Sequence, residues 1–207
     1  MARTVDPERH RARRLRIIDA ALTCFARHGY DRASTAAICR EAGIGSGTFF
    51  HYFPTKQDVL LATLALGTAE NEDWFAAQAV RDDAAGVLAD FVARTARQYA
   101  DPRTAGFVSA LGSVMGLPEV EAALAADTRG VLDGLRPWIE RAQHAGDVRD
   151  DLSAAQLARW VLVILDGFLG RAASGDGFEV ADEAPVLMDA VARLLAPAQA
   201  QPTPGSR

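Results

Sequence analysis

Apolar residues recur every three or four positions along nearly the whole chain, and this spacing predicts helices throughout. In the first such segment Ile18, Ala21, Leu22 and Phe25 follow the i, i+3, i+4, i+7 spacing of one helix face. The period-two alternation that is typical of strands does not occur. We therefore predict an all-α fold of about nine helices.

Caps and helix breakers indicate where these helices end. Gly29 favours a helix end, Ser34 or Thr35 can cap the next helix, and Thr55 and Ser153 each open a capping box. The expected helices span 10–28, 34–42, 45–52, 55–80, 83–99, 103–115, 118–145, 153 to the loop at 174–177, and 182–196.

Proline and composition suggest the larger divisions of the chain. Pro137 lies inside a predicted helix and removes one backbone hydrogen bond, so we expect a kink or break near Asp133. The predicted units are a three-helix unit at 1–55, a helical body at 56–197, and a disordered tail at 198–207.

The composition of the 207 residues, 49% hydrophobic and 24% charged, is that of a soluble globular protein. No apolar run is long enough to span a membrane, and the N-terminus lacks the pattern of a secretory signal, so we expect a cytoplasmic location. Cys24 and Cys39 lack CxxC spacing, which favours buried thiols over a metal or redox site. We predict no cofactor and no metal.

Charge is distributed unevenly. Residues 1–60 contain 10 Lys and Arg against 6 Asp and Glu, whereas the remaining 147 contain 12 against 21. A basic segment of this kind suits phosphate contact, but it also suits a solvated face. The same two interpretations apply to an expected N-terminal arm, which could reach phosphates or the minor groove. It carries Arg3, Arg9, Arg11, Arg13, Arg14 and Arg16.

The segment Ala42-Gly43-Ile44-Gly45 has the features of the turn in a helix-turn-helix. Gly43 accommodates a positive φ, and Ile44 can hold the turn against the core. The residues that follow, Gly45-Ser46-Gly47-Thr48, are small enough for a helix to approach base edges. We predict a recognition helix that begins near Ser46 and enters the major groove.

Five aromatic rings in succession follow this turn. Phe49 and Phe53, four residues apart, are expected in the core, which leaves Phe50, His51 and Tyr52 on the DNA side. The alternative is a purely structural aromatic plug. Next comes Lys56, whose charge at a helix N-terminus opposes the helix dipole unless an anion such as a phosphate lies beside it.

Residues Arg13 to Leu60 resemble the N-terminal domain of the TetR family of bacterial transcriptional regulators. The resemblance is carried, in order, by Ile17-x-x-Ala20-Ala21-x-x-x-Phe25, Gly29-Tyr30, Ser34-Thr35, Ile38, Ala42-Gly43-Ile44, Gly47-Thr48, Tyr52-Phe53 and Lys56. The resemblance implies DNA contacts at Ser34, Thr35, Ser46, Gly47, Thr48, Phe50, His51, Tyr52 and Lys56. Gly45 and Phe50 depart from the family, which usually has Ser and Tyr there.

The same resemblance implies that the body binds a small effector and forms a homodimer. The segment Trp160–Leu169 is apolar around nearly its whole circumference, which predicts either a dimer interface shared with 182–196 or a single buried central helix. The dimer would be a four-helix bundle across a two-fold axis.

Large apolar residues of the body are candidates both for an effector pocket and for the core. They are Trp74, Phe75, Phe91, Tyr99, Phe107, Met115, Trp138 and Trp160. Asp166 is either a buried partner for Arg or a ligand for a cationic effector.

These features together predict a homodimeric repressor that releases double-stranded operator DNA when a small molecule binds. An activator shares this architecture, and a helical sensor without operator binding is a further alternative. An enzyme is disfavoured because the chain has no HExxH, no GxSxG, and no third acid beside Asp82-Asp83 or Asp150-Asp151.

Overall fold

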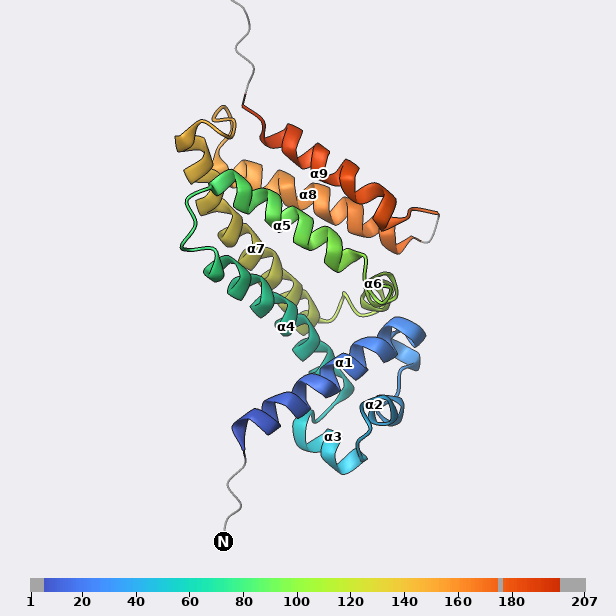
Figure 1. Cartoon of the computed structure of the whole chain (residues 1–207). Helices are drawn as coiled ribbons and strands as arrows, with labels where there is room; N and C mark the ends of the chain where they lie inside the picture. The colour runs from blue at the N-terminus through green and yellow to red at the C-terminus, as the bar shows by residue number, and fades with distance from the viewer. Residues whose placement is uncertain (1–5, 175–176, 198–207) are drawn as a thin grey trace, which may run out of the picture.

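The computed structural model describes residues 6–174 and 177–197, and over those ranges the chain forms nine helices and no strand (Figure 1). The helices are α1 (Pro7–Arg32), α2 (Thr35–Ala42), α3 (Ser46–Tyr52), α4 (Lys56–Ala77), α5 (Ala84–Tyr99), α6 (Thr104–Gly112), α7 (Pro118–Ala145), α8 (Ala154–Ala173) and α9 (Val180–Leu195). The all-α prediction is confirmed. The predicted tail lies outside the described residues.

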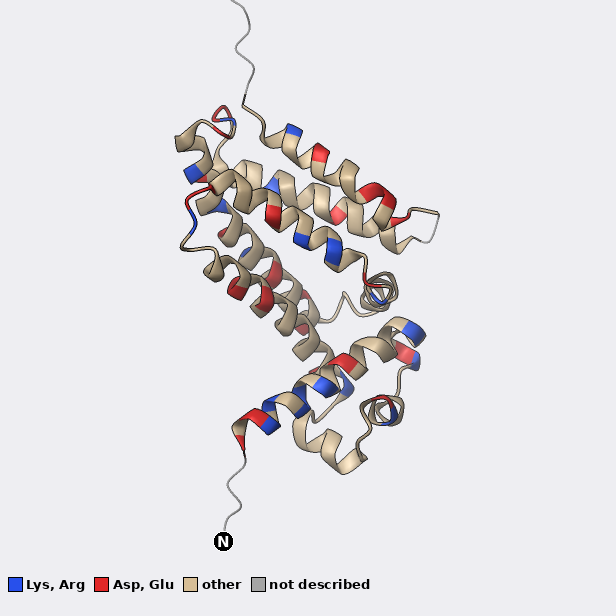
Figure 2. Cartoon of the chain, in the orientation of Figure 1, with Lys and Arg blue, Asp and Glu red and all other residues tan. Residues whose placement is uncertain are grey.

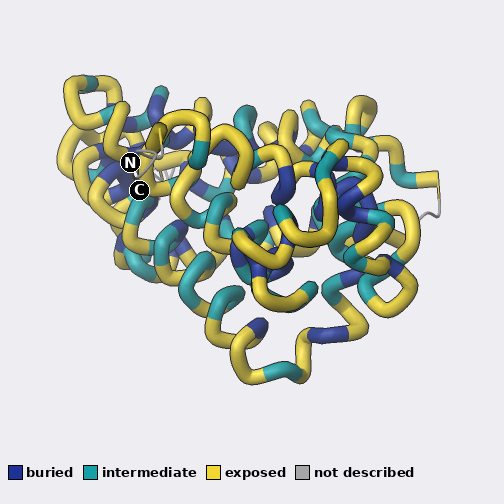
Figure 3. Tube along the Cα trace, turned by 90° about the horizontal axis from the view of Figure 1, so that it is seen from below, coloured by how far each residue is buried: buried dark blue, intermediate teal, exposed yellow. Residues whose placement is uncertain are grey.

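The helices form two groups, with α1, α2 and α3 at one end and α5, α7, α8 and α9 at the other, while α4 runs from the first group into the second (Figure 1). Buried and exposed residues alternate along the helical turns of the trace (Figure 3), and buried residues occur in both groups. Two apolar cores result. The first, around Phe25 and Phe49, also takes in the start of α4, part of α6 and Val120 of α7, and the second is built on α5, α7, α8 and α9.

Helix α1 begins at Pro7, three residues before the expected start. Oδ1 of Asp6 accepts hydrogen bonds from the amides of Glu8 and Arg9 at 3.1 and 3.4 Å, and Pro7 suits the first helical position. The described arginines of the expected arm, at positions 9–16, therefore lie on a helix and not on a separate arm.

Gly29 interrupts α1, as the sequence predicted. Its φ of 72° and ψ of 166° are open to glycine but not to residues with a Cβ, and one further turn follows to Arg32. Other ends shift by a few residues: α4 stops at Ala77, and α6 stops at Gly112. Pro118 favours extended backbone in the residue before it, so the chain enters α7 through a non-helical connection.

Of the kink or break expected near Asp133, the break does not occur, because helix α7 continues from Pro118 to Ala145. The buried neighbours Leu135, Trp138 and Ile139 fix this stretch in the core, which offsets the hydrogen bond lost at Pro137. Gly134 has a packing role, since a Cβ there would lie less than 3.0 Å from the Phe75 ring of α4.

Candidate nucleic-acid interface

The turn between α2 and α3 has the geometry that the sequence predicted. Gly43 is left-handed, with φ 63° and ψ 41°, and the amides of Gly43 and Ile44 donate to the carbonyls of Arg40 (3.2 Å) and Cys39 (3.0 Å). The half-buried Ile44 packs against the first core. These contacts fix the direction in which α3 leaves α2.

The amino end of α2 is capped by Ser34. Its Oγ accepts a hydrogen bond from the amide of Ala37 at 3.1 Å, and Thr35 is the first helical residue. The Ser34 hydroxyl is exposed and still has its proton to donate. Two of the predicted contact residues thus lie together at one helix end.

Helix α3 separates its aromatic residues between core and surface as predicted. Phe49 and Phe53 are 0% and 2% exposed, whereas Phe50 is 51% exposed and His51 is also exposed. The helix has no side-chain cap at Gly45. Its outward surface consists of Ser46, Gly47, Thr48, Phe50, His51 and part of Tyr52.

His10 of α1 packs against this surface and was not among the predicted site residues. Its ring centroid lies 4.5 Å from that of Tyr52 and 6.3 Å from that of His51. Arg14, one turn further along α1, lies over the Phe53 ring at 5.2 Å. No local sequence signal indicates these contacts, because they join residues about forty positions apart.

Exposed arginines follow the first half of α1 beside α3 (Figure 2). Arg9 pairs with Asp6 at 3.3 Å. Over residues 6–174 and 177–197, the side chains of Arg11, Arg13 and Arg16 take part in no hydrogen bond or ion pair. The surface formed by α1 and α3 therefore combines small, aromatic and basic side chains, which together suit a phosphate backbone and base edges.

Lys56 has partners within the chain that the sequence did not suggest. Its Nζ donates to the backbone carbonyl of Tyr30 at 2.7 Å, lies 3.4 Å from that of Asp31, and is 4.1 Å from the centroid of the Tyr30 ring. These carbonyls compensate the charge that opposes the dipole of α4. A phosphate contact at Lys56 stays a prediction.

The predicted effector residues do not gather around one cavity. Phe91 and Trp138 are buried in the core of the body, Trp74 and Phe75 pack against Phe91, and Met115 and Trp160 are each 53% exposed. Asp166 has no arginine partner in the described part of the chain, and burial together with the charge of Asp127 raises the pKa of its carboxyl group. Tyr99 and Phe107 alone among the candidates line the cavity described next.

A cavity of about 780 Å³, here called the junction cavity, lies where α1 meets α4, α5 and α6. Its lining combines apolar side chains with arginines and acids. Its lining is Leu15, Ile18, Asp19, Leu22, Thr63, Leu66, Gly67, Glu70, Arg94, Arg97, Gln98, Tyr99, Asp101, Arg103, Thr104 and Phe107.

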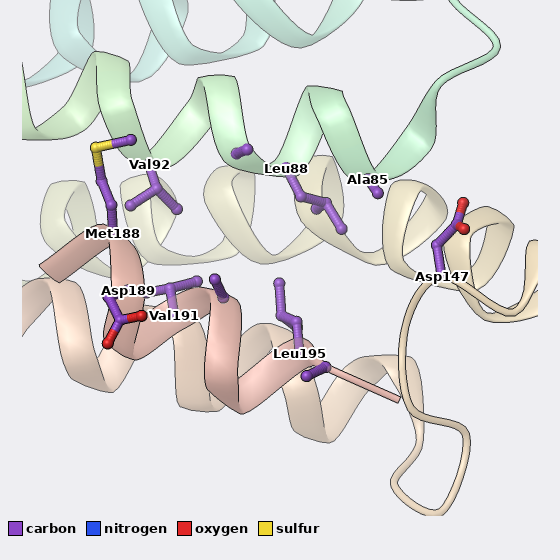
Figure 4. Close-up of a pocket in the computed structure, with 11 residues that line it drawn as sticks. Ala85, Leu88, Val92, Asp147, Met188, Asp189, Val191 and Leu195 are labelled. Carbon is purple, nitrogen blue, oxygen red and sulfur yellow. The ribbon is translucent and has the colours of Figure 1, made fainter. Parts of the chain in front are cut away.

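A second hollow of about 450 Å³ lies between α5 and α9 (Figure 4). Leu88 and Val92 of α5 face Val191 and Leu195 of α9, and Asp147 lies toward one end of the groove. No predicted effector residue lines it. Among the residues that the structure covers, no helix is long and apolar enough to cross a bilayer, and no three potential metal ligands cluster.

A short capped helix, a left-handed glycine turn and a second helix with an outward surface flanked by arginines define a helix-turn-helix DNA-binding protein. Residues 17–63 match the model of the bacterial regulatory proteins of the tetR family. The chain is 34% identical over 178 residues to the HTH-type transcriptional repressor Rv1474c of Mycobacterium tuberculosis, covering 80% of this chain and 84% of the relative. The chain belongs to the TetR family and is a DNA-binding transcriptional regulator.

Two other similarities agree with this assignment. The HTH-type transcriptional repressor AcnR of Corynebacterium diphtheriae is 27% identical, over 79% of this chain and 82% of that protein. The solved structure of the fatty acid degradation regulator FadR from Bacillus halodurans has a TM-score of 0.76 at 22% identity, over 87% of this chain and 94% of that chain, and shows the shared fold.

Proposed function

We propose that this chain is a homodimeric repressor that reads operator DNA with α3 and releases it when a small molecule binds the body. The observation that carries the proposal is the α2–Gly43–α3 geometry, which leaves Ser46, Gly47 and Thr48 outward while Phe49 anchors the helix. Relatives named as transcriptional repressors support repression over activation.

Within the interface we assign distinct roles. Small side chains at the start of α3 suit close approach to base edges, and Thr48 is the candidate for base preference. Ser34, Thr35, Phe50, His51, Tyr52 and Lys56 are proposed to position the helix, together with the α1 arginines. We further propose that residues 1–55 form the DNA-binding unit and 56–197 the effector and dimer unit.

The dimer is proposed on an exposed apolar face of α8 and α9. Trp160 and Val163 of α8 are 53% and 55% exposed, and Val186 of α9 is 60% exposed. The single chain does not bury α8 fully, so the alternative of a wholly buried central helix does not hold. A second copy would cover this face and place two recognition helices on one side of DNA.

Selection of bound sequences from a random duplex pool tests DNA recognition. We expect a two-fold symmetric consensus bound at least about a thousandfold more tightly than random duplex, with affinity that falls steeply with salt. Thr48→Ala should lose preference for the consensus more than general affinity, whereas Thr128→Ala on α7 should change neither. Equal binding to consensus and random DNA would refute operator recognition.

Analytical ultracentrifugation tests the dimer. Val163→Asp places a charge in the proposed interface and should shift the protein to monomer, whereas Val80→Asp, at a position 91% exposed, should leave the dimer intact. A Val163→Asp protein that stays dimeric at micromolar concentration would move the interface elsewhere.

A further inference from the structure

The junction cavity contains two arginines, Arg94 and Arg97, that form no ion pair among the described residues. Arg94 of α5 donates to the side-chain oxygens of Asn71 (2.8 Å) and Gln98 (3.4 Å) and to the Glu70 carbonyl (3.3 Å), all uncharged acceptors. Its guanidinium lies over the Trp74 ring at 5.8 Å, and partial burial lowers its pKa. The group is thus held in place and partly desolvated without a carboxylate in contact.

Arg97 lies one turn further along α5 and lines the same cavity. In the parts of the chain that the structure covers, its side chain has neither an ion pair nor a hydrogen bond, and its charge contributes to the lowered pKa of Arg94. Two like charges one helical turn apart disfavour each other, and an anion between them would relieve that cost.

The lining holds three acids and three arginines, but two of the acids are bound to one arginine. Arg103 is neutralised by Asp19 at 2.7 Å and by Asp101 at 2.8 Å, and it lowers the pKa of Asp101. Glu70 is the remaining acid of the lining and forms no ion pair within 4.0 Å among the described residues. Because Asp19 and Asp101 are both bound to Arg103, Arg94 and Arg97 are left with Glu70 as the remaining acid of the lining, and this local excess of one positive charge suits a monoanion better than a dianion.

The apolar part of the lining comes largely from α1. Leu15, Ile18 and Leu22 line it from α1, Leu66 from α4 and Phe107 from α6. A volume of about 780 Å³ lies in the usual range of small-molecule sites. The cavity therefore offers an anion site and a hydrocarbon surface to one ligand.

We propose that the junction cavity binds a monocarboxylate with an apolar body, the carboxylate between Arg94 and Arg97 and the hydrocarbon against α1, α4 and α6. Guanidinium groups match the planar carboxylate and can donate two parallel hydrogen bonds. The groove between α5 and α9 does not offer this chemistry, since its charged lining residues are Asp147 and Asp189. The proposal that this ligand binds rests on the cavity alone. The proposal that it acts as the effector also rests on the proposed repressor function.

Isothermal titration with decanoate, below the concentration at which it forms micelles, tests the binding. We expect saturable binding of one molecule per chain, with decanol and butyrate each at least about tenfold weaker because one lacks the charge and the other most of the apolar body. Equal affinity for decanol and decanoate, or no binding at all, would overturn the proposal.

Variants locate the site. Arg97→Gln should weaken decanoate binding about tenfold or more, and because Arg97 is exposed and its side chain has no hydrogen bond or ion pair within the described chain, the fold should be unaffected. Arg94→Gln should do the same, with its thermal unfolding checked because Arg94 has structural hydrogen bonds. The matched control is Arg129→Gln on α7, exposed and outside the cavity, which should bind decanoate like wild type. Unchanged binding in Arg97→Gln would overturn the assignment.

A second assay separates the two proposals. Decanoate should release the selected duplex from wild type and fail to do so from Arg97→Gln at the same concentration. Carboxylate binding that depends on Arg97, in a protein that binds no duplex selectively, would uphold the site and refute the repressor. Selective duplex binding without any carboxylate binding would uphold the repressor and overturn the site.

Discussion

Gly106 of α6 allows a close approach between α6 and α1, and replacing it by alanine tests whether that contact affects stability. A Cβ at this position would lie less than 3.0 Å from the carbonyl of Ala26 in α1. By helix propensity alone, Gly106→Ala would stabilise the protein by about 1 kcal/mol. The clash opposes this gain, since overfilling a packed site costs about 1–3 kcal/mol.

The upper part of that range applies because the obstructing atoms are backbone of another helix, which cannot rotate away as a side-chain end can. We expect Gly106→Ala to lower the free energy of unfolding by about 1–2 kcal/mol. For a chain of this size each kcal/mol corresponds to roughly 2–4 °C in Tm.

Circular dichroism during heating, at one fixed protein concentration, measures the effect. Gly112→Ala, at the end of the same helix with nothing within 4 Å of the added Cβ, is the matched control and should be at least as stable as wild type. If Gly106→Ala were as stable as Gly112→Ala, the close contact between α1 and α6 would have no energetic weight and the reasoning would fail.

Three further substitutions test the local structure of the DNA-binding unit. Thr55→Ala removes a capping box and should cost about 1 kcal/mol in urea unfolding, whereas Thr128→Ala should cost nothing measurable. Gly43→Ala forces a Cβ into the left-handed region and should cost about 1–2 kcal/mol, while Gly47→Ala, with open space around its Cβ, should not destabilise. Lys56→Met should lower the free energy of unfolding by about 1–3 kcal/mol because the hydrogen bonds of Lys56 are lost. If Lys56 contacts a phosphate, the substitution should also lower the slope of log affinity for DNA against log salt by about one, and an unchanged slope would exclude that contact.

The helix-turn-helix could be predicted from sequence because its signals are local. Gly43 sets a turn through its own backbone, Ser34 caps α2 through an amide three residues away, and Phe49 and Phe53 are separated from Phe50 by helical periodicity alone. Each of these effects acts within about five residues. The structure accordingly confirms them almost position by position.

The features that the sequence did not predict depend on contacts between segments that are far apart in the chain. Pro137 suggests a break by itself, but the packing of its neighbours in the body keeps α7 continuous. The carbonyls that bind Lys56 come from the end of α1, twenty-five and twenty-six positions earlier. Arg94 and Arg97 had no apolar or motif signal at all, and only the fold shows that they face a cavity.

Gly106 stands out in the sequence because a glycine inside a helix lowers its stability relative to alanine. One reason to have a glycine at such a position is the close approach of another segment. That cost is about 1 kcal/mol, similar to the net contribution of a typical hydrogen bond. Such a glycine does not by itself indicate a packed partner, because Gly112 of the same helix and Gly67 of α4 have nothing within 4 Å of an added Cβ. No pattern along the chain identifies α1 as that partner, because the contact joins segments about eighty positions apart.

Helix α1 connects the two halves of the protein through contacts at three levels along its length. His10 packs on Tyr52 of the recognition helix, and the Asp19 carboxylate accepts a hydrogen bond from Arg103 beside α6. Further along, the α1 backbone faces Gly106. A displacement of α6 must either carry α1 with it or break these contacts.

The junction cavity lies between α1 and the helices of the body, so a molecule that fills it acts on the spacing of the helices that these contacts join. A ligand shifts a conformational equilibrium only by its difference in affinity for the two states, and a cavity whose walls belong to both halves is a place where that difference arises. A ligand bound at Arg94 and Arg97 can therefore change the affinity of α3 for DNA.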